Sequence, residues 1–155
     1  MNIHRGFTLV ELMITLALAA ILLSIGIPSF QSYMEINRLA AQTNQMVQSL
    51  NLARSEAGKR GGNVVVAPLV AGNWAQGWQV WVDPNGNNSV DAGEEILLTV
   101  AALTGSSSLT STVANYRYLA SGRIAAIGTL TLTASTGGIR DIAISNTGRI
   151  SITKS

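Results

Sequence analysis

The pattern of apolar and polar positions changes twice along this chain of 155 residues. From Phe7 to Ile27 nearly every residue is apolar, and Glu11 is the only charged one. From Ser29 to about Gly58 apolar residues recur at steps of three and four, the spacing of one face of an α-helix. After Gly62 short runs alternate between apolar and polar residues, which is typical of β-strands. The pattern therefore predicts a long helix followed by a β-rich domain.

The first apolar stretch has the length of a membrane span. About 20 apolar residues in a helix cross a hydrocarbon core of about 30 Å. A secretory signal peptide would have a shorter apolar region followed by a small-residue cleavage site, whereas Gly6 precedes the stretch here. A carboxylate within a span costs roughly 2.5–3.5 kcal/mol at mid-helix and less near an end, so Glu11 calls for a function. The simpler alternative is an ordinary single-span anchor.

The second helical segment is predicted to pack one side on a sheet. Gln31, Glu35 and Gln42 are among the residues on its polar side. Glycines and cations between Gly58 and Gly62 predict the end of the helix, since glycine adopts a left-handed C-cap and cations favour the negative helix end. The apolar positions are Phe30, Tyr33, Ile36, Leu39, Ala40, Thr43, Met46, Val47, Leu50, Ala53 and Ala57.

Alternating segments predict an antiparallel sheet with one buried face, and hence an α+β fold. Residues 105–112, GSSSLTST, have low complexity and predict a mobile polar loop. The candidate strands are Val64 to Val70, Trp78 to Val82, Ile96 to Ala101, Val113 to Leu119, Gly122 to Ile127, Leu130 to Ala134, Ile139 to Ser145 and Arg149 to Thr153.

The stretch Gly6-Phe7-Thr8-Leu9-Val10-Glu11-Leu12 resembles the prepilin signature of type IV pilins and type II secretion pseudopilins. The resemblance implies that a prepilin peptidase cleaves after Gly6 and methylates the new N-terminus at Phe7. Glu11 would then pair with the N-terminal amine of a neighbouring subunit in the filament. Such a pair is physically reasonable, because opposite charges in an apolar environment relieve each other's desolvation. Family members often kink or melt the helix where Pro28 lies, as a missing N–H donor allows.

A second resemblance narrows the family. The run GWQVWVDPNGNNSVDAGEEILL, with the segments 118–123 and 142–150, resembles the FimT/GspH family of minor pilins and minor pseudopilins. The resemblance implies a leader (1–6), a transmembrane or filament-core helix (7–28), an amphipathic helix (29–60) and a β-rich head (61–155). It also implies a single-pass inner-membrane protein whose head is periplasmic, or extracellular in a pilus, and whose partners are other pilins or pseudopilins.

Composition argues against an enzyme. Cysteine is absent, and the single histidine, His4, lies in the segment that would be removed as a leader. Histidine-based triads, cysteine nucleophiles and the common histidine or cysteine metal sites are therefore excluded from the mature chain. Without disulfides, the head must rest on packing alone.

A calcium site is one candidate within the head. Asp83, Asn85, Asn87, Ser89, Asp91 and Glu94 fall at positions 1, 3, 5, 7, 9 and 12 of the calcium-loop pattern. Position six is Asn88 instead of glycine, and the flanking segments predict strands instead of helices. The alternative is a long hairpin turn in which Asp, Asn and Gly serve backbone geometry. No other cofactor is expected.

Charge suggests a second candidate, a site for double-stranded DNA. Between Arg117 and Ser155 the chain has five cations and one acid, Asp141, and a basic surface binds DNA by neutralising phosphates. Some FimT-type members are DNA-uptake receptors with a C-terminal Gly-Arg-x-Arg motif, which this chain matches as Gly148-Arg149-Ile150-Ser151 with serine in place of the second arginine. The alternative is a solvated strand face. The candidate DNA-binding residues are Arg149, Lys154, Arg140 and Arg123.

These observations favour a minor type IV pilin of the FimT type that takes part in pilus assembly at the tip and in DNA uptake. The alternative is a GspH-type minor pseudopilin of a type II secretion system.

Overall fold

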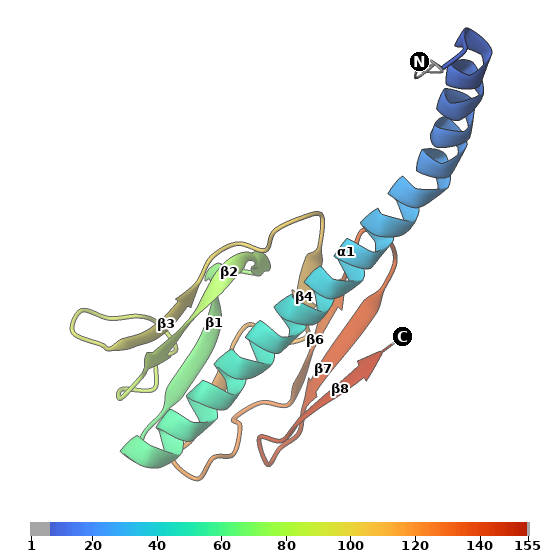
Figure 1. Cartoon of the computed structure of the whole chain (residues 1–155). Helices are drawn as coiled ribbons and strands as arrows, with labels where there is room; N and C mark the ends of the chain where they lie inside the picture. Colours follow the sequence, from blue (N-terminus) through green and yellow to red (C-terminus); the bar gives the residue numbers. More distant parts are fainter. Residues whose placement is uncertain (1–6, 155) are drawn as a thin grey trace, which may run out of the picture. The chain divides into compact units, whose positions relative to one another are not determined.

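A computed structural model describes residues 7–154 of the chain. It divides into two compact units, of which the first ends at Glu35 and the second, the head, begins at Ile36. The helix α1 (Leu9–Arg60) belongs to both units and contains Pro28. In the head, Figure 1 shows α1 lying against strands of two β-sheets.

The helix α1 ends at Arg60 because Gly61 takes a left-handed conformation with φ 64°. The N–H of Gly62 donates to the carbonyl of Ala57 at 3.3 Å. This is the hydrogen bond that spans six residues in a Schellman C-cap. The stop predicted near Gly58 is therefore correct within two residues, and the glycine that supplies it is Gly61.

The first sheet has the order β3-β2-β1-β5, and its paired strands are antiparallel. Its second strand begins at Asn73, five residues before the predicted start at Trp78. The strands are β1 (Val64–Val70), β2 (Asn73–Val82), β3 (Ile96–Val100) and β5 (Tyr116–Tyr118).

The second sheet has the order β4-β6-β7-β8 and is also antiparallel. The predicted α+β fold, a long helix on antiparallel sheet, is thus confirmed, with two sheets in the head. The strands are β4 (Ser108–Ser111), β6 (Gly128–Thr133), β7 (Ile139–Ile144) and β8 (Ile150–Lys154).

Two local predictions are wrong. The polar loop predicted at 105–112 contains β4, because Leu109 is buried and pairs with Leu132 of β6 while its polar neighbours stay more exposed. The strand predicted at 122–127 is a turn followed by a single bridge between Ile124 and Tyr118.

The core lies between the C-terminal part of α1 and both sheets. The packed face of α1 begins at Leu39, whereas Phe30, Tyr33 and Ile36 are all more than half exposed. Gln42 was assigned to the polar side and is in fact buried, because its side-chain amide donates to the carbonyl of Thr104 at 2.9 Å. The largest buried side chains are Trp74, Trp78, Trp81, Tyr116, Tyr118, Met46, Leu50, Leu130, Leu132, Ile142 and Ile144.

Candidate functional site

Glu11 lies in the first turn of α1 and is hydrogen-bonded within its own chain. Its Oε2 accepts hydrogen bonds from the backbone N–H and from the hydroxyl of Thr8, both at 2.9 Å. The Thr8 hydroxyl in turn accepts from the N–H of Glu11 at 3.2 Å. This reciprocal arrangement is a capping box, and the sequence signature Thr-x-x-Glu could have indicated it. Glu11 therefore stabilises the start of the helix, a role that the sequence pattern alone did not bring out.

The N-terminal unit leaves its apolar residues uncovered. Every residue from Phe7 to Ile27 is exposed, and Glu11 is the only charged one among them. The helix is long and apolar enough here to cross a membrane. Gly6, the residue expected to precede the cleavage site, lies outside the described residues, whereas the side chain of Phe7 is described and exposed.

The candidate calcium loop between β2 and β3 is organised around Asp83. The Asp83 carboxylate is fully buried and accepts hydrogen bonds from the N–H groups of Gly86, Asn87 and Asn88, at 2.8, 3.2 and 3.0 Å. Asn88 has a φ of 61°, so an asparagine takes the left-handed conformation at the position where calcium loops have glycine. The start of the loop is therefore held by its own backbone.

The other candidate calcium ligands also bond to one another. The side-chain amides of Asn85 and Asn87 both donate to Oδ2 of Asp91 at 2.7 Å, and the N–H of Asp91 donates to Glu94 Oε2 at 3.0 Å. Within residues 7–154 no group of three Asp, Glu, His or Cys side chains is placed to hold a metal. An ion would require both amides to turn their oxygens inward, since only the amide oxygen is a ligand. The calcium site stays a prediction.

The two Gly-Arg dipeptides of the chain form turns of the same geometry, at residues 119–123 and 145–149. In each turn the N–H of the glycine donates to the carbonyl of the first residue at 2.8 Å. The N–H of the first residue donates to the carbonyl of the arginine at 2.9 Å. Gly122 and Gly148 have φ values of 72° and 73°, a conformation that side chains disfavour. The glycine before each arginine is thus required by the turn.

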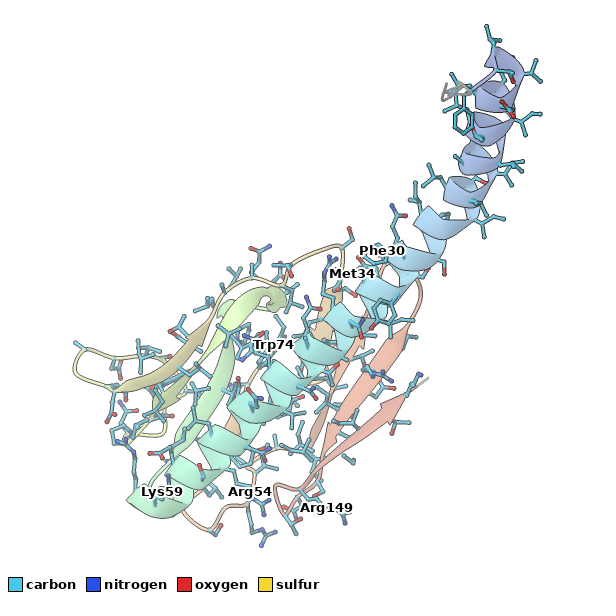
Figure 2. The ribbon with its side chains drawn as sticks, viewed as in Figure 1. Phe30, Met34, Arg54, Lys59, Trp74 and Arg149 are labelled. Atoms are coloured by element: carbon cyan, nitrogen blue, oxygen red, sulfur yellow. The ribbon has the colours of Figure 1, made fainter. Side chains whose placement is uncertain are left out.

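Arg54 of α1 holds the two turns together. Its Nε donates to the carbonyl of Gly122 at 3.2 Å, and its Nη2 donates to the carbonyl of Thr147 at 3.0 Å. Figure 2 shows Arg54, Lys59 and Arg149 near the end of the head where α1 terminates. The sequence offered no signal for this role of Arg54, because its position on the helix indicated only a polar residue.

Arg123 and Arg149 are both exposed. Within residues 7–154 neither side chain forms a hydrogen bond or an ion pair. The one acid in this part of the chain, Asp141, accepts a hydrogen bond from the Thr131 hydroxyl at 2.6 Å. We call the surface formed by Arg123, Arg149 and the accessible part of Arg54 the arginine turns.

The other two predicted DNA-binding residues lie elsewhere in the head. Arg140 and Lys154 pair across β7 and β8, and both line a pocket with Ile36 and Leu39 of α1. Leu39 precedes Arg54 by 15 residues, which is about 22 Å of helix at 1.5 Å per residue. The four predicted cations therefore form two pairs instead of one site. Lys154 lies three residues after Ser151 on β8, opposite Arg140.

Comparison with protein families assigns both parts of the chain. The profile described as type II transport protein GspH matches residues 42–148, which lie in the head. The prokaryotic N-terminal methylation motif matches residues 1–27, which include the exposed apolar stretch.

Curated relatives of the chain include fimbrial proteins. Fimbrial protein Q of Moraxella bovis is 33% identical over 144 residues, which cover 92% of this chain and 76% of that protein. A type IV major fimbrial protein FimA of Dichelobacter nodosus is 34% identical over 82 residues, 46% of this chain. The match spans about half, 53%, of the length of that FimA.

Solved structures share the fold. The type IV minor pilin FimU of Pseudomonas aeruginosa superposes with a TM-score of 0.66 and 20% identity, covering 78% of this chain and 92% of FimU. The minor pseudopilin EpsH from the type 2 secretion system of Vibrio cholerae gives a TM-score of 0.58 and 13% identity, covering 76% of this chain and 97% of EpsH. The chain thus belongs to the GspH family of type IV minor pilins and minor pseudopilins, which are structural components of filaments and not enzymes.

Proposed function

We propose that this chain is a minor subunit of a type IV pilus. Residues 7–28 anchor it in the inner membrane and later enter the filament core, residues 29–60 continue the helix into the head, and residues 61–155 form the β-rich part of the displayed head. The exposed apolar surface from Phe7 to Ile27 carries this proposal, because such a surface is stable only in lipid or against other apolar helices. The head is periplasmic before assembly and extracellular in the pilus.

Glu11 docks the processed subunit. Prepilin peptidase removes residues 1–6, and Phe7 becomes the methylated N-terminus. Within residues 7–154 both hydrogen bonds to the Glu11 carboxylate use Oε2, so Oε1 remains available to the amine of a neighbouring subunit. A single carboxylate can therefore cap its own helix and pair with a second chain.

Two substitutions separate these roles. Glu11→Gln keeps an acceptor for the helix cap but removes the charge, whereas Thr8→Ala removes the hydroxyl that bonds to Glu11 in the cap and keeps the charge. We expect both variants to be cleaved and inserted in the host membrane, and only Glu11→Gln to be depleted from sheared filaments by about tenfold or more, as expected when one partner of a desolvated pair is removed. Parental incorporation of Glu11→Gln would contradict the docking role.

Deletion of the chain in its host separates the two kinds of system. Loss of surface pili with intact protein secretion supports the pilus. Loss of secretion with intact pili would instead assign the chain to a type II secretion system, where it is a minor pseudopilin.

A second function, binding of double-stranded DNA, is supported by the arginine turns. Two exposed arginines without acidic partners lie on adjacent turns that Arg54 clamps to α1. Arginine binds phosphate through a planar fork of donors, and rigid turns reduce the entropy lost on binding. Pilus assembly places this head on the outside of the cell, where DNA is encountered.

Gel-shift titration of the detergent-solubilised full chain tests this second function. At two salt concentrations, we expect the slope of log affinity against log salt to become shallower by about 0.9 for each phosphate that Arg123→Ala or Arg149→Ala leaves without its cation. The matched controls are Arg140→Ala and Lys154→Ala, which remove the same charge from the other end of the head. Equal reductions in all four variants would show nonspecific attraction and refute the site.

A further inference from the structure

The strand β8 forms one edge of the second sheet, and its outer side is uncovered. The sheet order β4-β6-β7-β8 places it last, and Figure 1 shows it beside β7. Within residues 7–154 no other strand pairs with this outer side. All residues of β8 after Ile150 are exposed. Such an edge is a template for pairing with a strand of another chain.

The register of β7 and β8 shows which backbone groups of this edge are free. The N–H of Ser145 donates to the carbonyl of Arg149 at 2.9 Å, so these two residues form a hydrogen-bonded pair at the start of the ladder. Hydrogen-bonded and non-hydrogen-bonded pairs alternate along an antiparallel ladder, and the register continues without a shift. Ser151 and Thr153 therefore bond to β7. The residues whose N–H and C=O groups point outward are Ile150, Ile152 and Lys154.

Two other edges of the head are less open. The strand β3 joins β2 with a register shift, and β5 is partly covered by the bridge between Tyr118 and Ile124. Edge strands are commonly blocked by bulges, prolines or charges. The strand β8 has neither a bulge nor a proline, and its one charged residue, Lys154, comes at its end. Its middle is thus free to pair.

Lys154 occupies a position that is unfavourable for the sheet itself. It lies opposite Arg140, and the alternation makes this a non-hydrogen-bonded pair, the closer kind, in which like charges destabilise the sheet. Within residues 7–154 neither side chain forms an ion pair or a hydrogen bond. Asp141 lies on the other face of β7 and bonds to Thr131. An anion between the two cations would remove the repulsion.

The two cations line a small pocket on the helix side of the sheet. Its volume is about 130 Å³, below the roughly 300–1,000 Å³ of small-molecule sites, so its size suits a single side chain. Leu39 and Ile139 are among its apolar walls. Ile152, on the same face of β8 as Lys154, is 48% exposed. A strand added outside β8 would place alternate side chains against Ile152 and toward the pocket.

We propose that β8 pairs with an extended segment of a partner protein, which adds a fifth strand to the sheet and carries a carboxylate opposite Lys154. The outward backbone groups bond to the segment, and the carboxylate enters the pocket between Lys154 and Arg140. In strand addition, main-chain hydrogen bonds give affinity and alternate side chains give specificity. A free phosphate or a nucleic-acid backbone would leave the N–H and C=O groups of Ile152 unpaired with a strand.

This inference goes beyond the proposed function, since it applies to a partner in either a pilus or a secretion system. It assigns Arg140 and Lys154 to a protein instead of DNA.

NMR of the full chain in detergent micelles tests the proposal with a synthetic peptide. The probe is acetyl-Glu-Thr-Val-Thr-Val-amide, which in antiparallel pairing sets its glutamate opposite Lys154 and its valines opposite Ile152 and Ile150. Chemical shifts give the dissociation constant. At about ten times this concentration, we expect amide exchange at these three residues to slow about tenfold. Exchange at Ser151 and Thr153 should stay unchanged, because their N–H groups already bond to β7.

Control peptides and variants separate the backbone from the side chains. Methylation of the central valine nitrogen removes a donor to β8 and should weaken binding more than about tenfold. Glutamine in place of glutamate should weaken it about fivefold, the upper end for an exposed ion pair. Arg140→Gln with Lys154→Gln should remove this preference for glutamate, and Arg123→Gln with Arg149→Gln is the matched control that keeps it. Ile152→Pro should lose binding with the fold intact, since edge strands tolerate proline where the N–H faces solvent.

The opposite outcomes are distinct. Absence of binding at millimolar peptide, equal affinity of the methylated peptide, or equal slowing at Ser151 and Thr153 would overturn strand addition. Equal affinity of the glutamate and glutamine peptides for the parent would overturn the carboxylate site. Slower exchange at Ile152 with rising chain concentration, without peptide, would assign the edge to a second copy instead. Displacement of the peptide by inorganic phosphate or short double-stranded DNA at constant ionic strength would assign the cations to those anions. None of these results bears on incorporation into pili, so the two proposals fail separately.

Discussion

The indole N–H of Trp78 donates to the hydroxyl oxygen of Ser49 at 2.9 Å, and both residues are fully buried. This hydrogen bond joins β2 to the middle of the packed face of α1. The Ser49 hydroxyl also donates to the carbonyl of Gln45 at 3.0 Å, so the serine connects the sheet to the helix backbone. A polar residue thus occupies the core face of α1 because a tryptophan opposite it requires an acceptor.

Ser49→Ala should destabilise the head because it leaves the Trp78 N–H buried without an acceptor. The expected cost is about 1–3 kcal/mol in the free energy of unfolding. Denaturant titration of the full chain in detergent, followed by tryptophan fluorescence, measures it. Ser55→Ala is the control, since the Ser55 hydroxyl bonds only to its own helix at an exposed position. Adding Trp78→Phe to Ser49→Ala should not add the full cost of each change, and strict additivity would contradict the coupling.

The head should lose stability in acid, because Arg60 bonds to the carboxylates of Glu95 and Glu56. The hydrogen bonds from Arg60 lower the pKa of Glu95 below its usual value near 4.5, and bonds from Lys59 and then Arg60 lower the pKa of Glu56. A carboxylate with a lowered folded-state pKa stabilises the fold above its unfolded pKa, and this contribution is lost as pH falls through the folded value.

Thermal melts between neutral pH and pH about 3 test this. The drop in melting temperature below pH 4.5 should be smaller in Glu95→Gln than in the parent, and high salt should reduce the difference, since the groups are exposed. Asp141→Asn, whose carboxylate bonds to Thr131 in the other sheet, controls for a general effect of losing an acid. If the melting temperature of Glu95→Gln falls in acid as much as that of the parent, the Arg60–Glu95 pair does not cause the loss of stability.

Asp91 should stabilise the β2–β3 loop without calcium by its hydrogen bonds, and with calcium as a ligand. Without the ion it accepts from the amides of Asn85 and Asn87, so Asp91→Ala should lower the melting temperature even in chelator. If calcium enters the loop, calcium should raise the melting temperature of the parent and of Asn88→Gly but not of Asp91→Ala. Calorimetric titration without heat, together with equal melting of the parent in calcium and in chelator, would remove the metal site.

Sequence patterns predicted the fold well where a local rule decides the structure. The strand Val64–Val70 has the predicted bounds, because an apolar run with four valines lies between Gly62 and Gly72. The helix end was predicted within two residues from its glycines and cations. In contrast, β4 was missed because its residues are mostly serine and threonine, and Leu109, which is buried opposite Leu132, is its one apolar residue.

Sites were predicted less well because they combine residues distant in sequence. Gly122-Arg123 and Gly148-Arg149 were visible as dipeptides, but their proximity depends on Arg54, which lies on the helix. Arg140 and Arg149 are far apart because β7 and β8 run along α1 (Figure 1). The composition of the chain does not indicate the direction of these strands. Charge counting therefore found the cations of this part of the chain but could not group them.

Gly148→Ala should disrupt the arginine turns more than a comparable substitution at Gly137. Both glycines have left-handed φ values, 73° and 87°, so alanine at either costs about 1–2 kcal/mol of backbone strain. A Cβ at Gly137 meets nothing within 4 Å, whereas a Cβ at Gly148 would clash with the carbonyl oxygen of Gly122 and crowd Arg54. The free energy of unfolding of Gly137→Ala should therefore fall by the backbone strain alone.

The free energy of unfolding of Gly148→Ala should fall further, because the clash pushes the two turns apart. Any DNA affinity carried by Arg123 and Arg149 should fall as well. Denaturant titration and gel shift of the two full-length variants measure both effects, and equal behaviour of the two would show that the turns are not packed against each other as described.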